Sequence, residues 1–370
     1  MTPTRPQAIK NRASVSRDHQ RLENLVLKLR GGEWQKLPSK ERMRVVDMCV
    51  RYWRARGFPY YQLSDLEIVK DYDRLAAVSK GRILLGDEVQ VSMVGVKLAN
   101  YFHPQMWCVP INGAHSPIER FNDDEQLRRL ILRALTIWSD RYSVNEVNLR
   151  GMLRTFSNTA RVSNFRPTVA KALYEQYSKD GDTVLDFSSG YGGRLLGCLP
   201  LDRRYIGIDP CKDQARGLRN MVRTLNRLAR PKAQPSIYRQ CAEDFMPMLE
   251  SGSVSLVLSS PPYFNHERYS DEPSQSYIRY PTYDGWLEGF LRKVVAESQR
   301  VLRLGGHLLL NVADVNGLKL ADDVFRIASC YFTPVCILRL RLGHKPYLRH
   351  RTGKSFKYEP LFVFRKSRRR

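Results

Sequence analysis

The sequence predicts an α/β protein whose C-terminal half is a Rossmann-like, doubly wound, mainly parallel sheet, joined to an α-rich mixed N-terminal domain. From about residue 165, short apolar segments alternate with amphipathic helical segments, the pattern of βαβ units. A glycine-rich stretch joins one such strand to a helix, as in nucleotide-binding sheets. The last two strand-like segments have no helix between them, so we expect an antiparallel hairpin at one edge of the sheet.

The N-terminal part is predicted to be an arm followed by a separate domain. Residues 1–20 are polar and basic, which is typical of a flexible arm. Apolar residues recur at helical spacing over 21–56, and 123–142 is expected to form one helix. Residues 57–125 mix short β-like runs with aromatic loops. By elimination we expect the whole domain, 21–155, to recognise nucleic acid, because no large insertion interrupts the later half of the chain.

The C-terminal domain is predicted to span residues 156–366, with a basic tail at 367–370. Its helices are expected at 167–178, 192–200, 212–228, 286–302 and 322–332. Its strands are expected at 183–189, 204–210, 235–241, 254–260, 305–313, 334–342 and 358–366.

Composition points to a polyanionic partner. Among 370 residues, 61 Lys and Arg face 37 Asp and Glu, for a net charge of +24 and a pI near 9.9. Such an excess favours nucleic acid as the partner. The seven cysteines are scattered without a CxxC pair or zinc-ligand spacing, which indicates reduced thiols, a cytoplasmic location and no metal. No signal peptide or membrane-spanning run is evident in the sequence.

The glycine-rich stretch "DFSSGYGGR" resembles a cofactor loop more than a phosphate loop. Gly190, Gly192 and Gly193 lie between a predicted strand and a helix, where the missing Cβ atoms let a ligand approach the backbone. No Gly-Lys-Ser follows, which argues against a P-loop. Asp209 closes the next strand, where a carboxylate can accept hydrogen bonds from both ribose hydroxyls. Asp186 could serve the ammonium of an amino acid portion, so the pair suits S-adenosylmethionine.

A second motif, "SSPPYF", follows the strand at 254–260. Pro261 and Pro262 cannot donate backbone hydrogen bonds, so strand pairing should stop there. This leaves Ser260 and Tyr263 at the carboxyl end of a strand, the edge at which open α/β sheets bind ligands.

Four motifs, in this order, resemble the S-adenosylmethionine-dependent amino-methyltransferases of DNA, of the N4-cytosine/N6-adenine type. They are "SNFRPTVAKAL", "DFSSGYGGR", "YIGIDP" and "SSPPYF", and the resemblance covers residues 160–366. It implies a class I methyltransferase fold and a catalytic set of Ser260, Pro261, Pro262 and Tyr263. The cofactor-binding residues it implies are Phe165, Arg166, Pro167, Asp186, Ser188, Gly190, Gly192, Gly193, Asp209, Pro210, Ala242, Glu243 and Ser259.

The chain departs from the family pattern at two places. Phe187 and Ser188 follow the loop aspartate where Pro-Phe is common. Cys241 stands where an aspartate commonly contacts adenine, with Glu243 and Asp244 as alternatives.

The resemblance implies methyl transfer to an exocyclic amine of a base flipped out of double-stranded DNA. The Ser260 hydroxyl and the Pro261 carbonyl would accept hydrogen bonds from the N–H groups of the amine, and the prolines would hold both acceptors in place. Tyr263 would stack on the base, with Phe264 as a second wall. Serine before the prolines favours cytosine N4. N6-adenine methylation, methylation of an RNA amine and a catalytically silent nucleic-acid-binding partner remain open alternatives.

Basic residues near the C-terminus are the expected phosphate contacts. Residues 339–370 hold twelve Lys and Arg against one acid, with aromatics interleaved. From this region we expect Arg349, Arg351 and Lys354 to bind nucleic acid, together with Arg268 from the long segment after the catalytic loop. A companion restriction endonuclease is a further expectation. The sequence leaves the recognition site and the oligomeric state open.

Overall fold

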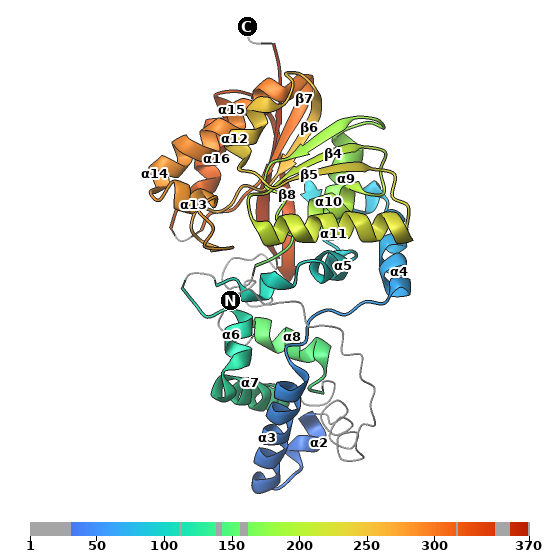
Figure 1. The fold of residues 1–370 in the computed structure, drawn as a ribbon, viewed down its shortest axis with the longest axis vertical. Coiled ribbons are helices and arrows are strands. Elements are labelled where there is room, and N and C mark those ends of the chain that lie inside the picture. The colour runs from blue at the N-terminus through green and yellow to red at the C-terminus, as the bar shows by residue number, and fades with distance from the viewer. Residues whose placement is uncertain are drawn as a thin grey trace. The chain divides into compact units, whose positions relative to one another are not determined.

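The computed structural model describes residues 31–110, 113–137, 143–155, 162–315, 317–344 and 356–368 (Figure 1). The chain forms two compact units, one of residues 1–60 with 105–162 and one of residues 61–104 with 163–370. The sequence predicts a single N-terminal domain over 21–155, whereas residues 61–104 belong to the second unit. The reason is their packing, because Leu75 and Leu98 lie in the same apolar core as the sheet.

The first unit is helical. It contains α2 (Gly31–Gln35), α3 (Ser39–Arg56), α6 (Pro117–Asn122), α7 (Asp124–Ile137) and α8 (Glu146–Thr155), and η2 (Pro104–Cys108) runs into it. Trp53 of α3 is fully buried in its core, and its indole N–H donates to the Val144 carbonyl at 3.1 Å. Helices α3 and α7 match the helical spacing in the sequence. The predicted arm at 1–20 lies outside the described residues.

The second unit is built on a nine-stranded sheet. Its strands are β1 (Leu84–Leu85), β2 (Glu88–Val89), β3 (Thr183–Asp186), β4 (Arg204–Ile208), β5 (Gln234–Tyr238), β6 (Val254–Ser259), β7 (Leu302–Asn311), β8 (Thr333–His344) and β9 (Phe356–Arg365). They lie in the order β1-β2-β8-β9-β7-β6-β3-β4-β5. Strands β5, β4, β3, β6 and β7 are parallel neighbours, and β9 runs antiparallel to both β7 and β8.

This strand order confirms the predicted fold class. The mainly parallel sheet, with one reversed strand inserted before the last long one, agrees with the Rossmann-like sheet that the resemblance to class I methyltransferases implies. One detail differs from the sequence prediction, because the antiparallel hairpin is not the edge of the sheet. Strand β2 pairs in parallel with β8, with Glu88 opposite Arg339, and β1 follows it. The sequence predicts short β-like runs within 57–125, but a local apolar pattern does not reveal which strand they pair with.

Helices cover both faces of the sheet. On one face lie α4 (Asp65–Ala76), α5 (Val96–Tyr101), α9 (Pro167–Tyr177), α10 (Gly193–Cys198) and α11 (Lys212–Leu228), after the short turn η1 (Lys80–Arg82). On the other lie α12 (Ala242–Phe245), η3 (Met246–Met248), α13 (Ser276–Arg279), α14 (Tyr283–Trp286), the π-helical turn η4 (Leu287–Leu291), α15 (Arg292–Val301) and α16 (Leu320–Ser329).

Alternation along the strands divides the apolar residues between the two faces. Leu256 and Leu258 of β6 enter the first core, whereas Val257 enters the second. In Figure 1, α11 accordingly runs along one side of the sheet and α15 and α16 along the other. No helix in the described part of the chain is long and apolar enough to cross a membrane.

Candidate cofactor and catalytic site

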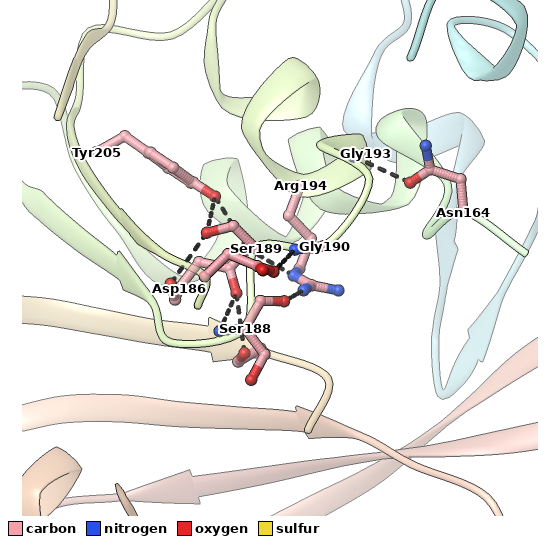
Figure 2. Close-up of polar contacts among 10 residues, drawn as sticks. Asn164, Asp186, Ser188, Ser189, Gly190, Gly193, Arg194 and Tyr205 are labelled. Atoms are coloured by element: carbon pink, nitrogen blue, oxygen red, sulfur yellow. Dashed lines mark hydrogen bonds and ion pairs between the residues drawn. The ribbon is translucent and has the colours of Figure 1, made fainter. Parts of the chain in front are cut away.

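A buried carboxylate, that of Asp186, holds the loop after β3 in place through hydrogen bonds. Asp186 has no exposed surface, and its carboxylate accepts hydrogen bonds from Arg194 Nε at 2.8 Å and from the Tyr205 hydroxyl at 2.9 Å (Figure 2). The Ser259 hydroxyl donates to the same carboxylate at 2.9 Å. Arg194 also donates to the Ser188 carbonyl, which ties the start of the loop to its end.

Asp186 therefore fixes the loop rather than facing a ligand. The sequence predicts that it serves the ammonium of the cofactor, but its oxygens are engaged by protein groups and it does not line the cavity described below. Arg194 is also buried. Burial alone would lower the pKa of its guanidinium, and the charge and hydrogen bonding of Asp186 raise it above the usual value. Breaking such a buried pair is costly because the remaining charge has no partner.

The glycines of the loop are required for two different structural reasons. Gly190 and Gly192 have φ values of +53° and +74°, the left-handed region that favours glycine. Gly193 instead allows close packing, because an added Cβ would lie 2.0 Å from the Phe165 carbonyl oxygen. The Asn164 side chain holds this contact in place, because its oxygen accepts from the Gly193 N–H at 3.0 Å (Figure 2). Its amide nitrogen donates to the Tyr191 carbonyl at 2.8 Å.

Asp209 lies just beyond β4 and faces the loop. Its carboxylate accepts from the backbone N–H groups of Gly190, at 2.8 Å, and Cys211, at 3.0 Å. The side chain is nearly buried, and burial raises its pKa to about 7, against the effect of these two hydrogen bonds. Each oxygen retains acceptor capacity toward a donor in the cavity.

The segment after β5 brings one of the two alternative acids to the site. Glu243, near the start of α12, is buried and forms an ion pair with Arg279 at 2.7 Å. Asp244 pairs with the same arginine but does not line the cavity. Cys241 donates to the Ser274 carbonyl at 3.4 Å and does line it, beside Ala242.

The Ser-Pro-Pro-Tyr segment interrupts the sheet as the sequence predicts. Pairing between β6 and β7 ends at Ser259, immediately before Ser260. The hydroxyl of Tyr263 donates to Glu359 of β9 at 3.1 Å, which fixes the ring. Burial, and then the charge of Glu359, raise the pKa of this hydroxyl well above its usual value. Phe264 has a φ of +51° and packs against Trp286 in the core, so it is not a second wall of the site.

One cavity brings most of the predicted residues together. The predicted residues that line it are Phe165, Arg166, Ser188, Gly190, Asp209, Pro210, Ala242, Glu243, Ser260, Pro261, Pro262 and Tyr263. Those that do not line it are Pro167, Asp186, Gly192, Gly193, Ser259, Phe264 and Arg268. Arg349, Arg351 and Lys354 lie outside the described residues.

Sequence reasoning missed several residues of this region. Asn164, Tyr191, Arg194, Glu267, Tyr269 and Glu359 also line the cavity. Arg194 follows the glycines directly, so a buried partner for Asp186 could have been anticipated. Glu267 and Glu359 are brought together by folding alone, because 92 residues separate them in the chain. Among the described residues, no group of three or more His, Cys, Asp or Glu side chains could hold a metal ion.

Comparisons with known proteins give distant structural matches alone. No protein-family model matches the chain, and no curated protein matches it. Solved structures similar to it include an S-adenosylmethionine-dependent O-methyltransferase from Thermotoga maritima (11% identity, TM-score 0.37, 57% of this chain and 69% of that one). Another is an S-adenosylmethionine-dependent methyltransferase from Methanosarcina mazei (14% identity, TM-score 0.36, 53% of this chain and 97% of that one). A third is geranyl diphosphate C-methyltransferase from Streptomyces coelicolor, in complex with S-adenosyl-L-homocysteine (15% identity, TM-score 0.35, 53% of this chain and 74% of that one). The fold assignment rests on the strand order described above.

Proposed function

We propose that the chain binds S-adenosylmethionine in this cavity. Asp209 supplies the carboxylate for the ribose hydroxyls, and its two backbone hydrogen bonds hold it in position. Gly190 leaves room above the loop, since an added Cβ would find no atom nearer than 3.8 Å. The buried Gln214 Oε1 has no hydrogen-bond partner among the described residues, and Gln214 lines the same cavity. These features fit a polar nucleoside ligand.

The reaction we propose is methylation of an exocyclic amine. S-adenosylmethionine supplies an electrophilic methyl group on a sulfonium. The amine of a base is a weak nucleophile, because its lone pair is delocalised into the ring. The Ser260 hydroxyl and the Pro261 carbonyl accept hydrogen bonds from its N–H groups and so concentrate electron density on nitrogen. The nitrogen then forms a bond to the methyl carbon as the bond from that carbon to sulfur breaks, and the methylated amine loses one proton to solvent. The observation that carries this proposal is that Ser260 to Tyr263 and Asp209 line one cavity.

We further propose a cytosine in double-stranded DNA as the substrate and N4-methylcytosine as the product. The high positive charge and the Ser-Pro-Pro-Tyr motif support it. The base would be flipped from the duplex and stack on Tyr263, whose ring is held by Glu359. The helical first unit, with Arg349, Arg351, Lys354 and Arg268, would contact the rest of the DNA. A cytoplasmic location and a companion restriction endonuclease belong to the same proposal.

Incubation of the purified protein with labelled S-adenosylmethionine and DNA tests the proposal. We expect label in DNA, and mass spectrometry of the hydrolysed nucleosides should identify N4-methylcytosine. N6-methyladenine would keep the mechanism and change the base, whereas label in RNA alone would change the polymer. A methyl group on carbon 5 of cytosine would refute the mechanism, since that reaction needs a cysteine nucleophile. Cofactor binding without any transfer would indicate a silent binding protein.

A further inference from the structure

One face of helix α11 carries a continuous line of cations. Lys212, Arg216, Arg219, Arg223 and Arg227 follow one another at intervals of three or four residues, and Arg230 lies two residues beyond the end of the helix. Residues at this spacing lie on the same face of a helix. All six side chains are exposed, and we call them the α11 cation row. At 1.5 Å per residue the helical part of the row, from Lys212 to Arg227, is about 23 Å long.

The opposite face of α11 anchors the row to the sheet. Leu218, Met221 and Leu225 are fully buried in the core of the second unit. Arg219 in addition donates to the Ile237 carbonyl of β5 at 3.1 Å. The row is therefore held on a rigid element, which Figure 1 shows as a long helix beside the sheet.

Few acids balance the row. Among the described residues, Arg216 pairs with Asp213 at 2.7 Å and Arg227 with Asp65 at 3.0 Å. Both arginines stay well exposed, with 58% and 62% of their side-chain surface accessible, so each can also bind another anion. Like charges at this spacing destabilise a helix. The pattern is thus unfavourable for folding alone, and a polyanion laid along the row would relieve it.

We infer that the α11 cation row binds the phosphate backbone of double-stranded DNA. Five of its six members are arginines, whose planar fork binds phosphate oxygens in a bidentate manner. Evenly spaced cations along a straight element match the regular line of phosphates on a DNA strand. These contacts position the duplex and carry no sequence information. The inference rests on the proposed function for its choice of DNA, and extends the contact surface to a helix outside the catalytic cavity.

Salt dependence of DNA binding tests the row directly. The variant combines Arg219→Gln, Arg223→Gln and Arg230→Gln, which remove three charges and keep long polar side chains. The control combines Arg292→Gln, Lys293→Gln and Arg326→Gln on α15 and α16, which lowers the net charge by the same amount on the other face of the sheet. Affinity for a nonspecific duplex is measured by fluorescence anisotropy between ~50 and ~200 mM salt.

For the row variant we expect the slope of log affinity against log salt to fall by roughly 2 to 3, about 0.9 for each lost phosphate contact. The control should keep the wild-type slope. Equal slopes in the row variant and the wild type would overturn the inference, and so would an equal loss in the control. A common unfolding midpoint for the three proteins shows that folding is intact. Methyl transfer by the wild type is measured separately. If the wild type binds DNA and the row variant shows the expected loss of slope, but the wild type transfers no methyl group, the proposed function is refuted and the inference about the row is not.

Discussion

The raised pKa of Asp209 makes ribose binding pH-dependent. Burial raises this pKa from 3.8 to about 7, so ionising the carboxylate inside the fold costs about 4 kcal/mol relative to water. Ribose hydroxyls that donate to the carboxylate favour its ionised form. Binding should therefore be strong above pH 7 and weaken as the pH falls below it. A carboxyl group with a pKa of about 7 is roughly tenfold less ionised at pH 6 than at pH 8, so we expect about tenfold weaker binding.

The assay is titration calorimetry with methylthioadenosine. This nucleoside keeps the adenine and the ribose but lacks the amino acid, whose α-amino group would titrate near pH 8 and obscure the result. Running the titration in two buffers of different ionisation enthalpy also counts the protons released. Near pH 6, we expect release of close to one proton per bound molecule.

Two variants isolate the responsible group. Asp209→Asn should bind more weakly and lose the pH dependence, because it cannot ionise. Glu267→Gln is the matched control, since burial also raises the pKa of Glu267 to about 7 and this residue lines the same cavity. It should keep the pH dependence. Constant affinity from pH 6 to pH 8 in the wild type, or a dependence that survives in Asp209→Asn, would refute the reasoning.

Four further predictions concern the catalytic loop and the loop after β3. Ser260→Ala should lower the single-turnover transfer rate by ~10² to 10³ with unchanged DNA affinity, because one preorganised acceptor is lost; Tyr263→Ala should cost ~1 to 3 kcal/mol in base capture, which Tyr263→Trp should largely restore. Gly193→Ala should destabilise the fold by ~1 to 3 kcal/mol in urea unfolding, because the added Cβ would meet a carbonyl oxygen. The control Gly81→Ala has open space around the added Cβ and should change stability by less than ~0.5 kcal/mol. Arg194→Ala should cost ~3 to 5 kcal/mol in the same measurement, because it leaves a buried carboxylate unpaired.

Each of these predictions has a contrary result. An unchanged rate in Ser260→Ala would remove the hydroxyl from the mechanism, and equal losses in the two Tyr263 variants would exclude stacking. Equal stabilities of the two glycine variants would mean that the loop shifts to accommodate the added Cβ of Gly193→Ala with no loss in the free energy of unfolding. A loss below ~1 kcal/mol for Arg194→Ala would show that water reaches the carboxylate.

The sequence by itself determined the sheet and the place of the loops. Apolar runs of strand length separated by amphipathic helices require a parallel sheet, and the carboxyl ends of its strands then share one edge. Because Asp209 and the Ser260–Tyr263 segment each follow a strand directly, their meeting at that edge follows from local pattern alone. The prolines add to this, since they end strand pairing wherever they occur.

Only the tertiary structure decided which charged groups face the cavity. Asp186 was predicted to meet a ligand, yet it meets Arg194, Tyr205 and Ser259, because the direction of a side chain depends on what packs around its strand. The sequence predicts Phe264 as a second wall of the base site, yet Phe264 has a left-handed backbone and packs into the core.

The same holds for contacts that join distant parts of the chain. Residues 61–104 join the sheet unit through the pairing of β2 with β8 and through apolar packing, which no local pattern marks. Glu359 reaches Tyr263 only because β9 inserts between β7 and β8. Local propensity acts over a few residues, whereas the walls of this cavity come from segments that folding brings together. For this reason the sequence predicts where the site lies, but only the fold shows which residues line it.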